Sequence, residues 1–416
     1  MEFDQLAEIY PDSIENSTFN IFSYDYDLEA SLSTFDLYDL IPTALVYGIT
    51  LITGLIGNGL IIYTVSHFRR MRTLSNVFLA SLASADLLLI IVCVPVKFGQ
   101  LFSFSWEIGP IPCKFVHYMQ NVSAICSVYT LTAMSIERYY AILHPVKSRY
   151  MCTMSHTRMI IVLTWIFSLI SASPIIHLQV HIEVGERYKA FWCYKDPSQP
   201  IIWKLYECYM LTLILVIPCI VMGFTYSCIC KKLWIVVQKR ATMFGHDNGN
   251  IELKNSKPMS DDRKMLRSEN SFSTKQHSMK NSSIQEMYSN KADDDTAVVK
   301  QVIKMLVAVV ILFILCWSPI LIINVLTAFG KLHQLNYGFL KPLRTAAHLL
   351  SYLNSCINPL VYGFMSKNFR ASFKAALQKC LACRSKGNQR SNSLSCRIST
   401  TVLTPAPSNL LTEVNY

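Results

Sequence analysis

Long apolar stretches constrain this chain more than any other feature of its sequence. A helix needs about 20 apolar residues to cross the hydrocarbon core of a bilayer. Polar residues interrupt the third stretch, and inside a membrane such residues usually face other helices. We therefore expect an all-α membrane protein, a seven-transmembrane helix bundle with the third helix near its centre. The stretches lie at roughly 40–66, 75–98, 110–142, 156–177, 200–230, 299–328 and 341–364.

The composition argues against several other classes of protein. Only 16% of the 416 residues are charged, against about 25% in a typical soluble chain, and 52% are apolar. The 14 cysteines are scattered through the apolar stretches rather than spaced as a disulfide framework. The net charge of +11 divides into −10 for residues 1–68 and +21 for the remainder, which is unlike the basic patch of a nucleic-acid-binding protein. A soluble enzyme, a disulfide-rich secreted domain and a nucleic-acid partner are therefore disfavoured.

Basic residues between the apolar stretches predict how the chain is oriented. Lys and Arg gather at 69–72, 138–158 and 231–300, and loops rich in these residues stay in the cytoplasm. The N-terminus is then extracellular and the C-terminus cytoplasmic. The predicted regions are an acidic disordered N-terminus (1–39), the bundle (40–366) with a long disordered third intracellular loop (231–298), an amphipathic membrane-surface helix (367–383) and a disordered tail (384–416).

Two features of the N-terminal region predict covalent modification outside the cell. Asn16 opens the sequence Asn-Ser-Thr, which is an acceptor for N-linked glycosylation. Tyr24 and Tyr26 lie within a run of Asp and Glu residues, the setting in which sulfotransferases modify tyrosine. We therefore expect a glycosylated and sulfated extracellular segment.

Asp86 lies in the middle of the second apolar stretch, where a lone carboxylate is costly and needs a partner. Oxygen atoms of Ser127 in the third stretch, and of Asn354 and Ser355 in the seventh, could join it in holding a small hard cation. An allosteric sodium ion is therefore expected here, and no other cofactor is indicated. The alternative is that Asp86 is simply hydrogen-bonded or protonated.

Prolines interrupt three of the apolar stretches deep within the membrane. Pro218, Pro319 and Pro359 each remove a backbone hydrogen bond and kink their helix. One such kink is unremarkable in a membrane protein, since neighbouring groups satisfy the freed carbonyl. Three kinked helices in one bundle predict hinges that move.

Seven short motifs follow one another along the apolar stretches. In this order they resemble the motifs of the rhodopsin-like (class A) G-protein-coupled receptors, over about residues 40–383. A channel or transporter would share the spans and Asp86, but not the whole set. The resemblance implies a plasma-membrane receptor, not an enzyme, with membrane lipid, heterotrimeric G proteins, receptor kinases and arrestin as partners. The motifs are Gly57-Asn58, Asp86, Glu137-Arg138-Tyr139, Trp165, Pro218 with Tyr226, Phe313 with Cys316-Trp317 and Pro319, and Asn358-Pro359-Leu360-Val361-Tyr362.

The resemblance also assigns roles to individual residues. Cys113 and Cys193 are expected to form the extracellular disulfide, and Cys380 and Cys383 to carry palmitoyl groups. The family's usual acid at the start of the sixth helix falls at Val299, so the contact that it makes with Arg138 is not expected here. The switch and G-protein-coupling residues are Glu137, Arg138, Tyr139, Val146, Tyr226, Phe313, Asn358, Pro359 and Tyr362.

Two positions exclude classes of ligand. An amine receptor of this family needs a carboxylate where Gln120 stands, and an opsin needs a lysine where Tyr352 stands. The stretch from Phe102 to Trp106 resembles that of peptide receptors. Gln120 and Asn324 are similar to residues of the cholecystokinin, orexin and allatostatin-like neuropeptide group, within which an invertebrate trissin-type receptor is one candidate. The alternative is a lipid or chemokine-like ligand. The predicted ligand-binding residues are Gln120, Asn324, His348, Lys97, Arg344 and Trp317.

Charge and hydrogen-bonding capacity suggest what such a ligand carries. The amides of Gln120 and Asn324 suit a peptide backbone or a C-terminal amide, because each offers a donor and an acceptor. Lys97 and Arg344 could bind a carboxylate, or simply reach solvent. The acidic N-terminal region would steer a ligand with basic residues, unless it is only a solvated tail. The resemblance favours Gq-type coupling and outward movement of the sixth helix.

Overall fold

The computed structural model describes residues 37–103, 105–184, 190–196, 198–252, 301–332, 340–366, 369–376 and 378. Several predictions concern positions beyond these ranges. The glycosylation site, the two sulfation sites and the two palmitoylation sites, at Asn16, Tyr24, Tyr26, Cys380 and Cys383, all lie outside the described residues. So do Val299 and the predicted tail 384–416.

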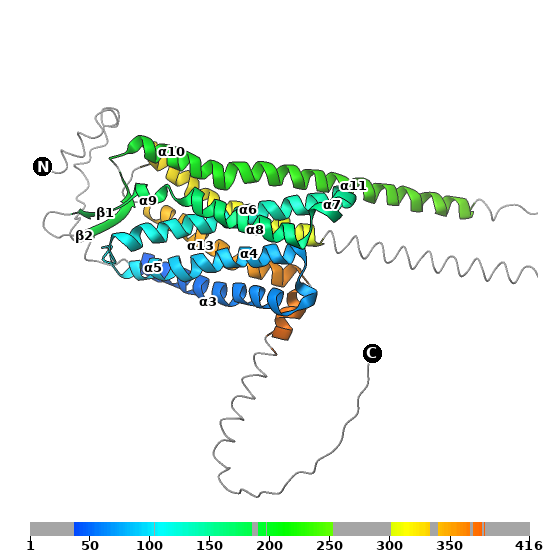
Figure 1. The fold of residues 1–416 in the computed structure, drawn as a ribbon, viewed down its shortest axis with the longest axis horizontal. Helices are drawn as coiled ribbons and strands as arrows, with labels where there is room; N and C mark the ends of the chain where they lie inside the picture. The colour runs from blue at the N-terminus through cyan, green and yellow to red at the C-terminus, as the bar shows by residue number, and fades with distance from the viewer. Residues whose placement is uncertain are drawn as a thin grey trace, which may run out of the picture.

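Seven long helical segments, counted within the described ranges, lie side by side along the length of the molecule (Figure 1). Two of them contain a π-helical segment, η4 (Leu89–Cys93) in the second and η6 (Thr212–Val216) in the fifth. The predicted all-α class is confirmed. The segments are α3 (Leu37–His67), α4 (Leu74–Leu88) continuing into α5 (Val94–Gly99), α6 (Pro110–Leu143), α8 (Met154–Ala172), α10 (Pro200–Leu211) continuing into α11 (Ile217–Glu252), the helix Gln301–Ala328, and α13 (Leu340–Met365).

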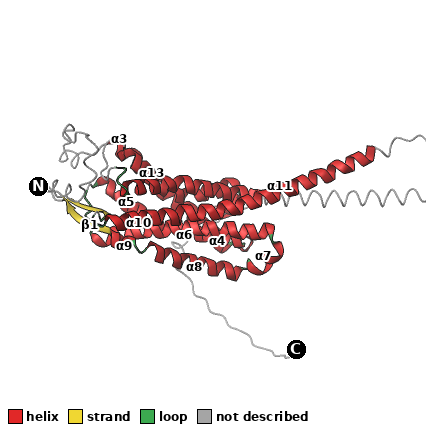
Figure 2. Cartoon of the chain, turned by 90° about the horizontal axis from the view of Figure 1, so that it is seen from above, coloured by secondary structure: helices red, strands yellow, loops and turns green. Residues whose placement is uncertain are grey.

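Short elements close the two ends of the bundle. One end carries the antiparallel hairpin of β1 (Gln179–Val184) and β2 (Ala190–Lys195), in which His181 pairs with Cys193 (Figure 2). The hairpin follows directly on α9, and the opposite end carries α7. The remaining short elements are η3 (Arg69–Met71), η5 (Gln100–Phe102), α7 (Pro145–Met151), α9 (Ile175–Leu178) and a helical turn at 369–376.

Local sequence signals mark where the helices begin. The side chains of Thr73 and Thr153 cap α4 and α8, because each accepts a hydrogen bond from the backbone N–H three residues later. Pro110, Pro145 and Pro200 stand in the first turns of α6, α7 and α10, where a missing N–H costs nothing. These signals agree with the boundaries that hydropathy alone predicts.

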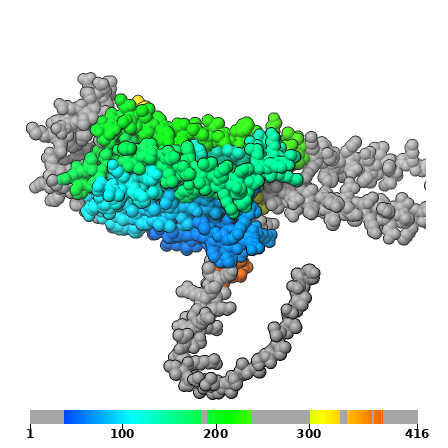
Figure 3. All heavy atoms as spheres, viewed as in Figure 1, coloured from blue at the N-terminus to red at the C-terminus, as the bar shows by residue number. Residues whose placement is uncertain are grey.

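Five of the described helical segments are long and apolar enough to cross a membrane by length and composition; α6 and α13 are not among them. Their polar side chains explain the difference, since Ser127, Thr130, Asn354 and Asn358 are buried between helices rather than placed toward lipid. The sides of the bundle carry large exposed apolar residues, which suit contact with lipid. In the space-filling view the facing side is a continuous surface of helices (Figure 3). The large exposed apolar residues of α8 include Ile160, Val162, Leu163, Ile166 and Ile170.

Two predicted boundaries differ from the structure. The third intracellular loop was expected from residue 231, but α11 remains helical to Glu252 and projects beyond the other helices. Residues 231–252 contain glycine but no proline, so nothing in them removes a helix hydrogen bond. The membrane-surface helix was expected from residue 367, whereas its described part covers 369–376 and 378, with Phe369 buried.

Close approach of α3 to α13 depends on glycine. A Cβ atom on Gly57 would lie 2.7 Å from the Cβ of Pro359, which real Cβ atoms essentially never do. The neighbouring Asn58 reinforces the contact, because its Nδ2 donates to the backbone oxygens of Gly54 at 3.0 Å and of Ser355 at 2.7 Å. The kink at Pro359 is therefore seated directly against the first helix.

Replacing Gly57 by alanine should push α13 away from α3. Overpacking of this kind typically costs about 1–3 kcal/mol, so we expect Gly57→Ala to lower the thermal unfolding temperature of the purified protein in detergent. Gly59→Ala is the matched control, since no atom lies within 4 Å of its added Cβ and the change should be neutral or slightly stabilising. Equal melting temperatures for the two variants would contradict the packing argument.

Candidate functional site

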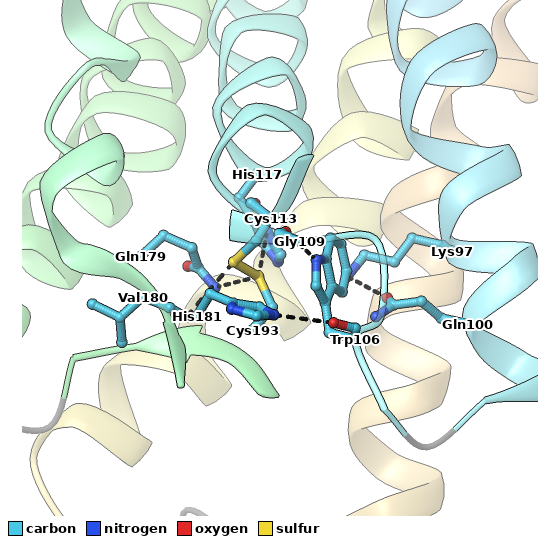
Figure 4. The surroundings of a disulfide bond; sticks show 10 residues. All are labelled: Lys97, Gln100, Trp106, Gly109, Cys113, His117, Gln179, Val180, His181 and Cys193. Carbon is cyan, nitrogen blue, oxygen red and sulfur yellow. Dashed lines mark hydrogen bonds between the residues drawn. A yellow bond between two sulfur atoms is a disulfide. The ribbon is translucent and has the colours of Figure 1, made fainter. Parts of the chain in front are cut away.

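A disulfide joins the hairpin to the third long helix. Cys113 in the first turn of α6 is bonded to Cys193 on β2, with their Cα atoms 5.7 Å apart (Figure 4). The predicted pair is therefore present. Gln179 of β1 donates from Nε2 to the sulfur of Cys193 at 3.3 Å, so both strands contact the bridge. The hairpin is held over one end of the bundle, which we call the outer end.

The loop before α6 is attached to the same hairpin through Trp106. Its backbone N–H donates to the carbonyl of Phe191 at 2.7 Å, and its own carbonyl lies 3.0 Å from Nε2 of His181. The indole N–H donates to the carbonyl of Gly109 at 2.8 Å, where a φ of 88° turns the chain into α6 (Figure 4). Trp106 is 2% exposed, so it is a structural anchor.

Basic side chains from three elements lie within electrostatic range of two histidines at the outer end. Lys97 of α5, Lys195 of β2 and Arg344 of α13 all act electrostatically on His348, and Lys97 and Lys195 also act on His117. We call these five residues the outer cluster. Within it, the Lys97 amine lies 3.3 Å from the side-chain oxygen of Gln100 and 5.7 Å from the Trp106 ring centroid. The outer cluster therefore places positive charge where ligand binding is predicted.

Below the outer cluster, two predicted ligand residues are tied into the bundle. Gln120 accepts a hydrogen bond at Oε1 from the Tyr352 hydroxyl at 3.0 Å. The Tyr352 and Tyr47 rings pack edge to face, with their centroids 5.5 Å apart. Trp317 stacks on Phe313, and its indole N–H is buried with no hydrogen-bond partner among the described residues. That unused donor, unlike Gln120 Oε1, is free for another molecule.

Arg344 and Asn324, which are also predicted to bind the ligand, lie on two neighbouring helices. Arg344 donates to the Thr327 hydroxyl at 3.0 Å, which ties α13 to the helix Gln301–Ala328. Asn324 is half-buried on that same helix, and no contact joins it to the outer cluster among the described interactions. Five of the six predicted ligand residues, all but Asn324, are thus connected to neighbours at or below the outer end, and Trp317 also offers a free donor.

Sequence reasoning missed a second buried acid. Glu207 of α10 is 2% exposed, forms an ion pair with Lys195, and accepts a hydrogen bond from the indole N–H of Trp203 at 3.0 Å. The signal that identified Asp86 was present here too, because Glu207 is an acid within a predicted span. Glu207 lies near the end of that span, where an acid is less unusual than in the middle.

Asp86 is completely buried, and it has one hydrogen-bond partner that the sequence did not predict. Its Oδ2 accepts a hydrogen bond from Asn358 at 2.9 Å, a residue assigned only to the switch. Ser355 is close enough to act on the carboxylate, whereas Asn354 is buried without a hydrogen bond to it among the described residues. Asp86 Oδ1 and Ser127 Oγ are both buried and without hydrogen-bond partners among the described atoms.

At the opposite, inner end of the bundle, the predicted charge pair has an unpredicted third member. Arg138 Nε lies 3.1 Å from Glu137 Oε2, and the hydroxyl of Ser75 on α4 donates to that same oxygen at 3.0 Å. Arg138 also donates to Ser75. Ser75 carries no distinguishing pattern in the sequence, because only the packing of α4 against α6 brings it to Glu137. The pair is thus a cluster across two helices.

The remaining switch residues are spread over the inner half of the bundle. Tyr362 is buried with its ring 5.8 Å from that of Phe369, and its hydroxyl has no partner among the described atoms. Tyr139 packs against Phe224 of α11, and Tyr226 is partly buried against the core. Val146 is 72% exposed on α7. Glu137 and Arg138 are thus paired directly, and Tyr226 lies within electrostatic range of Arg138 without a hydrogen bond to it among the described residues.

Comparison with known proteins decides the family. The model of the 7 transmembrane receptor (rhodopsin family) matches residues 57–362. The chain belongs to this family. It is therefore a multi-pass membrane receptor and not an enzyme.

Several curated receptors are similar to this rhodopsin-family chain over most of its length. The cholecystokinin receptor of Xenopus laevis is 30% identical, with 81% of this chain and 77% of the relative covered. The pyroglutamylated RF-amide peptide receptor of Rattus norvegicus is 28% identical over 81% of this chain and 70% of its own. The allatostatin-A receptor of Bombyx mori is 28% identical, with 80% of this chain and 78% of the relative covered. The chain is thus similar to neuropeptide receptors, as the sequence motifs predict.

Removing the Ser75 hydroxyl should loosen the resting arrangement of this receptor. A hydrogen bond to a charged group contributes about 1.5–3 kcal/mol, so Ser75→Ala should raise ligand-independent G-protein activation several-fold. The measurement is nucleotide exchange on G proteins of each class in membranes. Ser84→Ala is the control on the same helix, because that hydroxyl bonds only the backbone of Ala80. Unchanged basal exchange in Ser75→Ala would show that the bond does not hold the resting state.

Proposed function

We propose that this chain is a cell-surface receptor for a neuropeptide or peptide hormone that signals through heterotrimeric G proteins, with Gq-type coupling favoured. The similarity to peptide receptors supports the ligand class. The observation that carries the proposal is the outer cluster, where Lys97, Lys195 and Arg344 converge from three elements beside the hairpin. A lipid ligand would call for an apolar lining, whereas a peptide offers charges and amides.

The ligand is proposed to contact residues at and below the outer cluster. Gln120 and Asn324 would bond backbone or terminal amide groups, although the Tyr352 hydroxyl already donates to the side-chain oxygen of Gln120. His348 and Arg344 would meet polar groups on the side of α13. Lys97 would pair with a carboxylate of the ligand. The Trp317 indole N–H, buried and without a partner among the described atoms, would mark the depth of the site.

Signal transmission is proposed to run through the kinked helices. An agonist that fits the active arrangement better than the resting one shifts the population by that difference alone. Trp317 stacks on Phe313 one turn below it, so displacing Trp317 would move the helix Gln301–Ala328 outward about the kink at Pro319. This movement would end the resting pair of Glu137 and Arg138 at the inner end.

The inner end would then accept the G protein. Arg138, once released, would be exposed to a G-protein segment, and Tyr226 and Tyr362 would turn inward to support it. The unpartnered Tyr362 hydroxyl is consistent with a group that finds its partner in another state. Val146 on α7 is exposed and would contact the body of the G protein. Asn358 and Pro359 would carry the change along α13, and Tyr139 would seat α6 against α11.

Asp86 and its neighbours fit a sodium ion. The carboxylate oxygen Oδ1 and the Ser127 hydroxyl are buried without partners among the described atoms, and hard oxygen ligands suit such a cation. We propose that these two atoms hold the ion, with Asn354 and Ser355 beside them. The ion would supply the positive charge that a buried carboxylate otherwise lacks. These residues belong to α4, α6 and α13, so they would link three helices in one state.

The ends of the chain are proposed to complete the receptor. Asn16 would carry a glycan outside the cell, and Tyr24 and Tyr26 would carry sulfate in an acidic region that attracts basic peptides. Inside the cell, palmitoyl groups on Cys380 and Cys383 would anchor the segment after α13 to lipid. The serine-rich tail would be a substrate of receptor kinases and then bind arrestin.

Sodium should stabilise the purified receptor through Asp86. We expect a higher melting temperature in sodium chloride than in choline chloride at equal ionic strength. The gain is about 1.4 kcal/mol of unfolding free energy when sodium is near tenfold its dissociation constant. Asp86→Asn should abolish the difference, and Asp39→Asn, which changes a surface carboxylate, should keep it. A wild-type protein that melts identically in both salts would rule out the ion.

A neuropeptide panel tests the function itself. Cells expressing the receptor should respond to one or more peptides with calcium release, and cAMP measured in parallel distinguishes Gq from the other classes. Cells expressing Arg138→Ala provide the control, because they lose the proposed coupling residue but keep the outer end. A response only to lipids or to chemokine-like proteins would replace the proposal with its alternative.

A further inference from the structure

The ion pair between Lys195 and Glu207 is the one contact at the outer end that joins the hairpin to α10 by charge among the described residues. Glu207 is 2% exposed, and Asp86 and Glu207 are the buried acids of the described chain. Trp203, one turn earlier on α10, donates to the same carboxylate at 3.0 Å. Removing a partner from a buried charge is strongly unfavourable, so Glu207 requires a cation at all times.

Lys195 and Glu207 differ in how readily each could leave the ion pair. The Lys195 side chain is 20% exposed, against 2% for Glu207. Lys195 also stands at the end of β2, where its amine lies 5.5 Å from the centroid of the Tyr206 ring. A lysine has a long flexible stem and a well-hydrated ammonium, so it can move into water while the acid stays. The pair can therefore open only by departure of Lys195.

The carboxylate of Glu207 has unused capacity. Both Lys195 and Trp203 bond to Oε1, and Oε2 receives no hydrogen bond from the described residues. Oε2 is therefore available to a further hydrogen-bond donor. A planar guanidinium can bond both oxygens of a carboxylate at once, which a single ammonium cannot do. The geometry thus suits an arginine side chain better than the resident lysine.

The acid next to Lys195 in the chain is already engaged. Asp196 follows Lys195 directly, but its carboxylate accepts hydrogen bonds from the Ser198 hydroxyl at 2.6 Å and the Gln199 amide at 2.9 Å. Chiefly through the Ser198 hydroxyl, these bonds hold the pKa of Asp196 below its usual value. That acid is engaged within its own turn, outside the bundle. A cation that enters beneath the hairpin is repelled by the other cations of the outer cluster and attracted toward the buried Glu207.

We propose that Glu207 binds a basic side chain of the ligand, of the guanidinium class, and that Lys195 is a resident cation that fills this site until the ligand displaces it. This assignment rests on the proposed peptide-receptor function and specifies one group of the ligand. Displacement detaches β2 from α10 while the disulfide still holds β2 to α6. The hairpin thus keeps its position over the bundle but releases the fifth helix. The acidic N-terminal region, with a charge of −10 over residues 1–68, attracts a ligand that carries this positive group.

Amine labelling of Lys195 tests the exchange without an agonist or a G protein. The purified full-length chain in lipid nanodiscs is incubated with N-acetyl-argininamide or with its neutral isostere N-acetyl-citrullinamide, then labelled with an acylating reagent and analysed by peptide mass spectrometry. The arginine probe should raise labelling of Lys195 several-fold, and the citrulline probe should not. Lys204, also on α10 but stacked at 5.9 Å from the Phe329 ring centroid, is the internal reference and should label equally throughout.

Two variants complete the test. In Glu207→Gln, Lys195 should label rapidly with or without the arginine probe. In the exchanged pair K195E/E207K, the charges remain matched for folding, and the arginine probe should no longer increase lysine labelling at position 207. Equal responses to the two probes in the wild type, or no response up to the solubility limit of the arginine probe, would overturn the proposal. A positive peptide panel combined with such a result would reject only this site, and the reverse result would reject only the peptide-receptor assignment.

Discussion

The structure depends on the inability of lipid to form hydrogen bonds. A polar side chain placed inside a span must find its partner on another span, so each such pair fixes how two helices are rotated and how far they are shifted. Several pairs do this between different helices of the described chain. Examples are Asp86 with Asn358, Asn58 with the backbone of Ser355, Gln120 with Tyr352, and Asn121 with Tyr206.

The two ends of the bundle use charge in the same way, although for different tasks. Each end holds one acid that is largely withdrawn from water, one base that is more exposed, and one neutral donor that adds a second bond to the acid. In both clusters the neutral donor stands on one of the long helices. Ser75 is a residue of α4, and Trp203 is a residue of α10. Because the base is the more exposed partner, each cluster opens toward water on one side only.

Most of the fold follows from the sequence, while the site follows only in part. Apolar stretches predict the seven spans, and the resemblance to a known family supplies the pair Cys113 and Cys193. Asn358 as a partner of Asp86, and Ser75 as a partner of Glu137, were not predicted. Pairing across helices depends on rotation about each axis, and the π-helical segments η4 and η6 shift that rotation within α4–α5 and α10–α11. Such a shift cannot be read from hydropathy.

The antiparallel hairpin has a consequence for how its sequence can vary. Successive side chains on a strand point to opposite faces, so Cys193 and Lys195 of β2 share one face because they are two residues apart. The disulfide anchors the first of them to α6 and thereby sets the direction of the second. A deletion or insertion of one residue between them would turn Lys195 away from α10 while leaving every amino acid of the pair in place. The spacing of these two residues is therefore as restricted as their identities, even in a loop where changes of length are otherwise well tolerated.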